Sequence, residues 1–276
     1  MKIFVVGLGL MGSTFAESLM RKGHQVFGFD KDQKVIEKAI KDQVIYDSNL
    51  DLIDEADLIM LCLYPKQNIE FVRTHKNRFN KQLITDISGT KVHMINEILS
   101  ILPHIRYVST HPMAGREKNG YDNRDLTMFK DANFLIVKNE NSTMKDIKLI
   151  EGLAKELAFG RITTLDPREH DQLIAHTSQL THLLAVSLML SDDSVHTKDA
   201  TGDSFRDLTR IAKINEEMWS ELFMDNKEAL IEETNRFISV LENLKNMIKH
   251  EDYSQLKSNL RKSKEKRISF DESKSR

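Results

Sequence analysis

The chain has 276 residues, of which 40% are hydrophobic and 30% are charged, and its formal net charge is −2. This length allows one large domain or two ordinary ones, and the near-neutral charge argues against a general nucleic-acid binder. The single cysteine, Cys62, excludes an internal disulfide and a cysteine-based metal site, which suits a protein of the reducing cytoplasm that needs no metal.

Short apolar runs alternate with amphipathic segments over the first 165 residues. Buried strands are predicted at 3–6, 25–29, 58–63, 82–85, 105–108, 134–137 and 162–165, and helices at segments such as 13–22 and 142–158. Strands that alternate with helices indicate a doubly wound, mostly parallel sheet. We therefore predict an α/β, Rossmann-type dinucleotide-binding domain over residues 1–165.

The sequence changes character at Asp166-Pro167, beyond which there is no further proline and one glycine. Long helical patterns dominate there, and we predict an all-α substrate and dimerisation domain over 166–262 and a charged C-terminal tail over 263–276. No segment approaches the roughly 20 continuous apolar residues that span a bilayer, so no membrane contact is expected.

One apolar stripe in the helical region recurs at spacings of four, three and four residues. Its members are Phe237, Leu241, Leu244 and Ile248. The stripe indicates either an ordinary core face or a dimer seam. Because a small helical domain often needs a partner to bury its apolar faces, we expect a homodimer through this domain.

A glycine-rich segment, Gly7-Leu8-Gly9-Leu10-Met11-Gly12, follows the first predicted strand and opens the first predicted helix. Gly7 permits a tight turn, Gly9 lets the backbone approach a pyrophosphate, and Gly12 lets helix and strand pack closely. The helix start at Leu10 and Met11 then offers unpaired N–H groups to the phosphates. These features predict a dinucleotide cofactor.

Asp30 ends the second predicted strand, 18 positions after Gly12. A carboxylate there can accept hydrogen bonds from both ribose hydroxyls of NAD and would repel the 2′-phosphate of NADP. Lys31 next to it softens this discrimination. We predict a preference for NAD over NADP.

A histidine stands at the head of the segment HPMAGREKNG, residues 111–120, just after the predicted strand at 105–108. A proline- and glycine-rich loop of this kind would hold the imidazole of His111 at a strand end, where open α/β sheets place their chemistry. A neutral histidine is suited to accept a proton near pH 7. His111 is therefore the candidate catalytic base.

Three further segments accompany this loop: DISGTK at 86–91, DQLIAHTSQLTHLLA at 171–185, expected as one helix, and FRDLTRIA at 205–212. The last is followed by Asn215, Met218, Trp219 and Asn226. Together with the HPMAG loop they resemble the prephenate dehydrogenase family, the prephenate and arogenate dehydrogenases of tyrosine biosynthesis, over residues 2 to about 267. The glycine motif is shared by many families, whereas the HPMAG and FRDLTRIA segments are much more specific.

The resemblance implies NAD-dependent oxidative decarboxylation of prephenate to 4-hydroxyphenylpyruvate, with His111 as the catalytic histidine. It assigns Arg210 to a substrate carboxylate, which a guanidinium binds with two parallel hydrogen bonds. It also places His182 near the substrate. For Arg206, four residues before Arg210, we expect a surface ion pair with Asp203 or Asp207.

The chain departs from the family pattern at three places. The family order Gly-Ser is Ser88-Gly89 here, so the hydroxyl that assists the histidine is displaced, and either Ser88 (as a catalytic residue) or Thr90 (at the substrate) could supply it. The first histidine of the family's Ser-His-Leu-Pro-His is Gln179. An additional acid, Asp203, could favour an amino group on the substrate and hence arogenate.

Two other functions fit parts of the sequence. A β-hydroxyacid-dehydrogenase-like NAD oxidoreductase would share the glycine-rich start, but it would need a catalytic lysine at a glycine-rich helix start, which we do not find. A non-catalytic dinucleotide sensor would keep the fold without the chemistry, and the presence of His111 and Arg210 argues against it.

Overall fold

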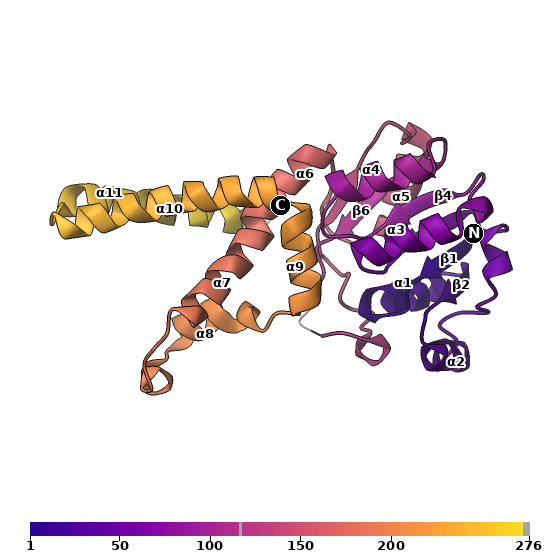
Figure 1. The fold of residues 1–276 in the computed structure, drawn as a ribbon, viewed down its shortest axis with the longest axis horizontal. Helices are drawn as coiled ribbons and strands as arrows, with labels where there is room; N and C mark the ends of the chain where they lie inside the picture. The colour runs from indigo at the N-terminus through magenta and orange to yellow at the C-terminus, as the bar shows by residue number, and fades with distance from the viewer. Residues whose placement is uncertain (116–117, 273–276) are drawn as a thin grey trace. The chain divides into compact units, whose positions relative to one another are not determined.

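The computed structural model describes residues 1–115 and 118–272 (Figure 1). Arg116 and Glu117 of the HPMAG segment, and residues 273–276 of the predicted tail, lie outside the described residues. The chain forms two compact units, Met1–Lys227 and Glu228–Arg276. The division predicted at residues 165 and 262 stays a prediction.

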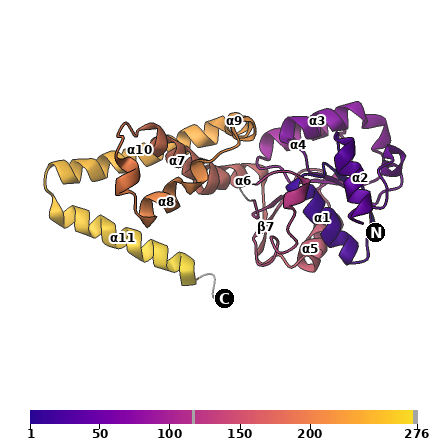
Figure 2. The same cartoon turned by 90° about the horizontal axis from the view of Figure 1, so that it is seen from below.

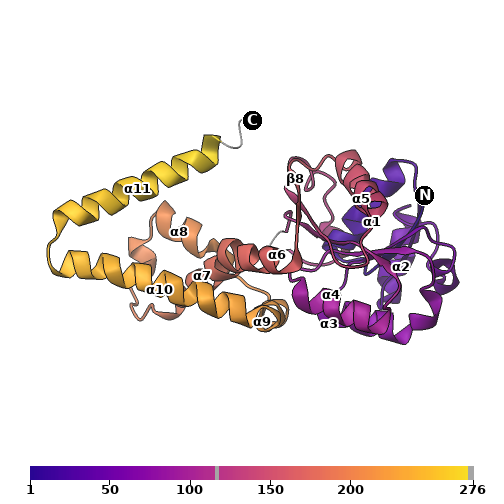
Figure 3. The same cartoon turned by 90° about the horizontal axis from the view of Figure 1, so that it is seen from above.

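A five-stranded parallel sheet with the strand order β2-β1-β3-β4-β5 organises the first unit. Its strands are β1 (Lys2–Val6), β2 (Gln25–Phe29), β3 (Leu58–Leu61), β4 (Leu83–Asp86) and β5 (Arg106–Tyr107). Helices α3 (Pro65–Thr74) and α4 (Val92–Ile101) cover one face, and α1 (Leu10–Arg21) and α5 (Met144–Glu156) the other (Figures 2 and 3). Helix α2 (Gln33–Lys41) follows β2.

Strand β1 shows why this sequence forms a two-sided sheet. Successive side chains of a strand point to opposite faces. Ile3 and Val5 accordingly join the core under α1 and α5, whereas Phe4 and Val6 join the core under α3 and α4. A strand buried on both faces reads as a continuous apolar run, and the predicted Rossmann-type fold is confirmed.

A second, three-stranded sheet contains β6 (Ser109–Pro112), β7 (Phe134–Val137) and β8 (Ile162–Leu165), with β6 antiparallel to β7 and β7 parallel to β8. Here one expectation was wrong. His111 does not open a loop after a strand at 105–108. It lies on β6, opposite Leu135, because the chain leaves the first sheet after β5 and pairs with β7 instead.

The helical part of the first unit starts where the sequence indicated. Asp166 accepts hydrogen bonds from the backbone N–H groups of Arg168 and Glu169, and Pro167 occupies the first turn, a strong helix start. Helix α6 (Pro167–Ile174) continues through a π-helical turn, Ala175–Gln179, into α7 (Leu180–Leu190). Then follow α8 (Asp203–Thr209), the 3₁₀ turn Arg210–Ala212 and α9 (Glu216–Asp225).

The helical stretch Pro167–Leu190 is long and apolar enough to cross a membrane by length and composition, although we expected no such segment. His170, Asp171 and Gln179 on it are buried and hydrogen-bonded to other parts of the unit. Such polar connections are typical of a helix that packs within a folded domain. Only 28% of its most apolar window is buried within this one chain.

The second unit contains α10 (Lys227–Lys249) from its second residue onward and α11 (Tyr253–Glu272). The predicted apolar stripe lies on α10, where Leu241 is 53% and Ile248 is 64% exposed. The first ten residues of the predicted tail continue α11. Apolar surface on this unit is therefore left uncovered by the single chain.

Candidate active site

The glycine-rich loop between β1 and α1 has the geometry that an anion requires. Gly7 has φ of +95°, and a Cβ on Gly12 would lie 1.8 Å from the carbonyl oxygen of Gly7. Both positions therefore need glycine. A Cβ on Gly9 would meet nothing within 4 Å, so the loop faces open space there.

The start of α1 suits a phosphate. No side chain caps the helix, and its first turn, from Leu10 and Met11 onward, contains no acidic residue. The unpaired N–H groups and the positive end of the helix dipole are left for a ligand. The predicted cofactor residues Gly7, Gly9, Leu10, Met11 and Gly12 thus come together in one loop that fits a pyrophosphate.

Asp30 lies beside this loop. Its carboxylate accepts hydrogen bonds from the backbone N–H groups of Leu8 (2.8 Å) and Asp32 (3.0 Å). Asp30 therefore also fixes the shape of the glycine loop. Next to it is an open hollow of about 330 Å³, whose lining includes Phe29, Lys31, Leu63 and Phe71. Its size and partly apolar walls fit the adenosine half of a dinucleotide.

His111 lies at the same edge of the sheet as the glycine loop. Asp86 at the end of β4 pairs in register with Leu61 of β3, and Leu61 pairs with Val6 of β1. Gly7 follows Val6 directly. The Thr110 hydroxyl donates to the Asp86 carbonyl (2.7 Å) and so fixes β6 at this edge. Two strand spacings, about 10 Å, separate β4 from β1. Open α/β sheets bind ligands at this carboxyl edge.

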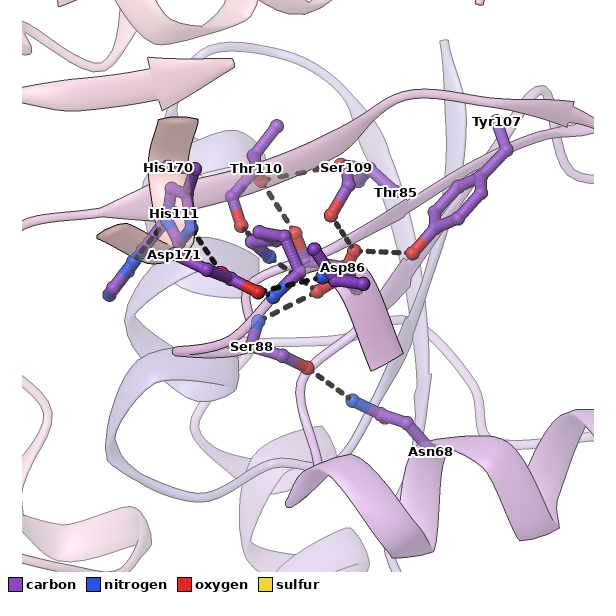
Figure 4. A network of polar contacts seen from close by, with 12 residues as sticks. Asn68, Thr85, Asp86, Ser88, Tyr107, Ser109, Thr110, His111, His170 and Asp171 are labelled. Atoms are coloured by element: carbon purple, nitrogen blue, oxygen red, sulfur yellow. Dashed lines mark hydrogen bonds and ion pairs between the residues drawn. The ribbon is translucent and has the colours of Figure 1, made fainter. Parts of the chain in front are cut away.

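The imidazole of His111 contacts a second histidine. Its Nδ1 lies 2.9 Å from Nε2 of His170, and Nδ1 of His170 lies 2.8 Å from Oδ1 of Asp171 (Figure 4). Burial, with smaller contributions from His170 and Lys91, holds the pKa of His111 well below 6.5. His111 is therefore neutral near pH 7 and can accept a proton.

The Asp171 carboxylate binds the start of α4, which lacks a cap of its own. It accepts from the backbone N–H groups of Lys91 (2.9 Å) and Val92 (2.9 Å), and it also accepts from His170. A carboxylate is favourable at the positive end of a helix. Asp171 thereby ties the helical segment to the sheet at the site itself.

A buried ion pair lies under His111. Lys91 Nζ donates to Asp86 Oδ2 (2.7 Å) and to the carbonyl of Thr110 (2.6 Å), and both charged side chains are fully buried. Asp86 also accepts from the hydroxyls of Tyr107 and Ser109 (Figure 4). These contacts connect β4 with β5 and β6 and hold the strand of His111 in place.

The two hydroxyls predicted to assist His111 differ in their surroundings. Ser88 Oγ accepts from Asn68 Nδ2 (3.4 Å) on α3, and Figure 4 shows the side chain directed toward Asn68. Thr90 Oγ1 is buried and has no hydrogen-bond partner among the described residues. At Gly89, a Cβ would come within 3.1 Å of Leu222 on α9. The roles of Ser88 and Thr90 stay predictions.

The helical segment contributes an aromatic wall. His182 on α7 stacks on Trp219 of α9 with ring centroids 3.7 Å apart, and its Nδ1 donates to the carbonyl of Ser178 (2.9 Å). Arg210 lies in the exposed 3₁₀ turn that packs beside α7. The structure thus brings helix α7, which contains His182, and the turn of Arg210 together.

Asp203 and Gln179, the residues at the other two departures from the family pattern, make contacts within the fold. Arg206 forms the predicted surface ion pair with Asp203 (2.5 Å), whose side chain is 89% exposed. Gln179 donates to the Leu222 carbonyl (2.7 Å) and accepts from Asn226 (2.8 Å). Gln179 thereby connects the π-helical turn to α9.

Sequence reasoning missed His170, Asp171 and Lys91 as members of this site. The available signal was the His-Asp pair four and five residues after the helix-starting Asp166, and a lysine in an otherwise apolar and small-residue stretch. Among the described residues, no three His, Cys, Asp or Glu side chains gather as metal ligands.

Comparisons with known proteins agree with this arrangement. Residues 15–162 match the family model "Prephenate dehydrogenase, nucleotide-binding domain", and residues 166–262 match "Prephenate dehydrogenase, dimerization domain". A prephenate dehydrogenase of Lactococcus lactis is 30% identical over 86% of this chain and 68% of its own length. A cyclohexadienyl dehydrogenase of Zymomonas mobilis is 29% identical over 97% of this chain and 95% of its own.

A solved structure extends the likeness to three dimensions. The crystal structure of prephenate dehydrogenase from A. aeolicus, in complex with hydroxyphenyl propionate and NAD+, is 26% identical, with a TM-score of 0.89. The likeness covers 98% of each chain.

Proposed function

The chain belongs to the prephenate dehydrogenase family, and from this premise we propose that it converts prephenate to 4-hydroxyphenylpyruvate with NAD, in tyrosine biosynthesis. One observation carries the proposal: a neutral, half-buried histidine lies at the same sheet edge as a glycine loop shaped for a dinucleotide. The bound NAD would supply the acceptor for the hydride that leaves the substrate ring.

His111 would act as the base of this reaction. It holds the proton of the ring hydroxyl at one imidazole nitrogen while the C=O bond develops, and loss of CO₂ then makes the ring aromatic. Burial keeps the imidazole neutral and ready to accept that proton. Because aromatisation favours the reaction, the protein mainly has to position the substrate and accept the proton.

The helical segment would bind the substrate. Arg210 pairs with a substrate carboxylate through its planar guanidinium, and His182, stacked on Trp219, lines the ring. Thr90 Oγ1 is buried and has no partner among the described residues, and it is our candidate for a hydrogen bond to a substrate oxygen. Ser88 remains a candidate partner of His111.

NAD is the proposed cofactor. The glycine loop, the uncapped start of α1 and the carboxylate of Asp30 support it, as does the A. aeolicus structure in complex with NAD+. Lys31 lines the neighbouring hollow and would reduce discrimination against NADP. We expect higher catalytic efficiency with NAD, and equal efficiency with both cofactors would contradict the role given to Asp30.

Arogenate is the alternative substrate. The similar protein from Zymomonas mobilis is named for the wider cyclohexadienyl class. Asp203 is the residue that pointed to arogenate, and it forms an exposed ion pair with Arg206. We therefore favour prephenate.

We further propose a homodimer through the helical region and a cytoplasmic location. The name of the matched dimerization domain, the exposed Leu241 and Ile248, and the incompletely buried helix Pro167–Leu190 support the dimer. The single cysteine, Cys62, agrees with a reducing compartment.

The test is NADH formation with prephenate and with arogenate. His111→Asn should lower kcat by about 10²–10⁴-fold and leave substrate binding intact, because a general base contributes by about that factor. Arg210→Ala should mainly raise KM. His196→Asn and Arg21→Ala, both exposed, are the matched controls. Wild-type protein inactive with both substrates would overturn the proposal.

A further inference from the structure

We propose that His170, held by Asp171, determines which ring nitrogen of His111 is free to accept the substrate proton. His170 is then a positioning residue. This inference rests on the proposed function, in which His111 is the base. Two hydrogen bonds carry it, His111 Nδ1 to His170 Nε2 (2.9 Å) and His170 Nδ1 to Asp171 Oδ1 (2.8 Å).

The direction of these bonds follows from the last acceptor. An ionised carboxylate can only accept, so Nδ1 of His170 carries the hydrogen and donates it to Asp171. A neutral imidazole has one donor and one acceptor nitrogen, so Nε2 of His170 must accept. Nδ1 of His111 therefore carries a hydrogen and donates it. The lone pair of His111 is left on Nε2, the nitrogen that does not face His170.

The charges around the pair favour this state. Burial lowers the pKa of His170, and Lys91 lowers it further, while the hydrogen bond to Asp171 and the charge of Asp86 oppose this. Near pH 7 both histidines are then neutral. Each imidazole carries a single hydrogen, and the donor and acceptor roles along the two bonds stay as assigned. His170 is fully buried, which prevents its ring from turning toward solvent.

Asp171 fixes the far end of the chain. Its two carboxylate oxygens accept the N–H groups of Lys91 and Val92 at the start of α4, so the carboxylate cannot rotate away from His170. When Nε2 of His111 takes the substrate proton, the resulting positive charge is shared along the hydrogen bond to His170. The negative charge of Asp171 stabilises it there, the same logic as in an acid–base triad.

The competing explanation is that His170 only packs β6 against α6. Two substitutions separate the explanations. His170→Gln can preserve both bonds, because its amide oxygen accepts from His111 and its amide nitrogen donates to Asp171. His170→Leu fills similar space and preserves neither bond. His196→Leu, at an 83% exposed side chain, is the control.

With prephenate and NAD, we expect His170→Leu to lower kcat by about 10²-fold or more while KM changes by less than about threefold. His170→Gln should retain kcat within about tenfold of wild type. A packing role predicts instead that kcat follows the thermal stability of each variant. His170→Leu at near wild-type kcat would overturn the proposal, as would a folded His170→Gln that loses as much as His170→Leu.

The tautomer of His111 is a readout independent of activity. It is measured by long-range ¹H–¹⁵N NMR on the purified full-length protein, whatever its oligomeric state. Wild type should carry the hydrogen on Nδ1, His170→Gln should keep it there, and His170→Leu should populate the Nε2–H form. A wild-type hydrogen on Nε2 overturns the positioning role even in an active enzyme. An inactive wild type with the Nδ1–H form overturns the proposed reaction instead.

Discussion

Substitution of Lys91 by Met tests the buried charge pair beneath the site. Lys91 Nζ contacts Asp86 Oδ2 at 2.7 Å and the Thr110 carbonyl at 2.6 Å, with both charged side chains at 0% exposure. Burial opposes the charge on Asp86, but Lys91 and the hydroxyls of Ser109 and Tyr107 hold its pKa below 3.8. Burial opposes the charge on Lys91 too, and for this cationic group it lowers the pKa.

Removing one partner of a buried pair costs about 3–5 kcal/mol, because the other charge stays buried without compensation. In Lys91→Met, Asp86 keeps three donors, from Tyr107, Ser109 and the Ser88 N–H. We therefore expect the lower end of this range, a loss of about 3 kcal/mol in the free energy of unfolding. In the double variant with Asp86→Asn neither member of the pair carries a charge, so its loss should be smaller than the sum of the single losses by about 2 kcal/mol.

The free energy of unfolding is measured by urea titration at pH 7, with the double variant completing the cycle. Because the folded pKa of Asp86 lies below 3.8, the pair stabilises the protein fully above that pH and its contribution is lost as pH falls through the folded value. The loss in free energy of unfolding caused by Lys91→Met should therefore become smaller at such acidic pH. A loss under about 1 kcal/mol at pH 7, or strictly additive effects, would refute this reasoning.

Catalytic efficiency should stay constant to well below pH 6.5, because only neutral His111 accepts a proton and its pKa is strongly lowered; an acid limb centred at 6.5 would contradict this. In NADH fluorescence titrations Gly12→Ala should lose binding together with stability, since its Cβ would lie 1.8 Å from a backbone oxygen. Gly9→Ala should weaken binding about tenfold or more while Tm stays within about 1 °C, and an equal loss of Tm in both variants would argue against the loop as a phosphate site. Light scattering should give about twice 31.9 kDa, and Leu241→Glu should shift the mass toward the monomer; a monomeric wild type would exclude the dimer.

The glycine loop could be predicted because its constraints are local. Gly7, Gly12 and the strand before them act within one turn of the chain, and the alternation of β1 places side chains on both faces without reference to distant residues. The start of α6 was equally readable, since Asp166 and Pro167 act on the helix that they begin.

The surroundings of His111 depended on distant pairings. The break between β5 and β6 follows from antiparallel pairing with β7, some 25 residues later, and nothing in the run at 105–108 signals it. His170 meets His111 from 59 residues away. The direction of the Ser88 side chain is set by Asn68 on α3, and a residue pattern carries no information on that contact.

The cap on α4 has a consequence for the order in which the molecule is made. Lys91 and Asp171 are 80 residues apart, so at about 5–20 residues per second the carboxylate is synthesised roughly 4–16 s after the start of the helix that it caps. Until then the N–H groups at the start of α4 lack the carboxylate that accepts from them in the folded protein. His170 arrives one residue earlier than Asp171, so the same late step completes both the helix and the surroundings of His111. The nascent chain therefore completes its cofactor loop well before it acquires the two residues that complete the surroundings of its proton acceptor.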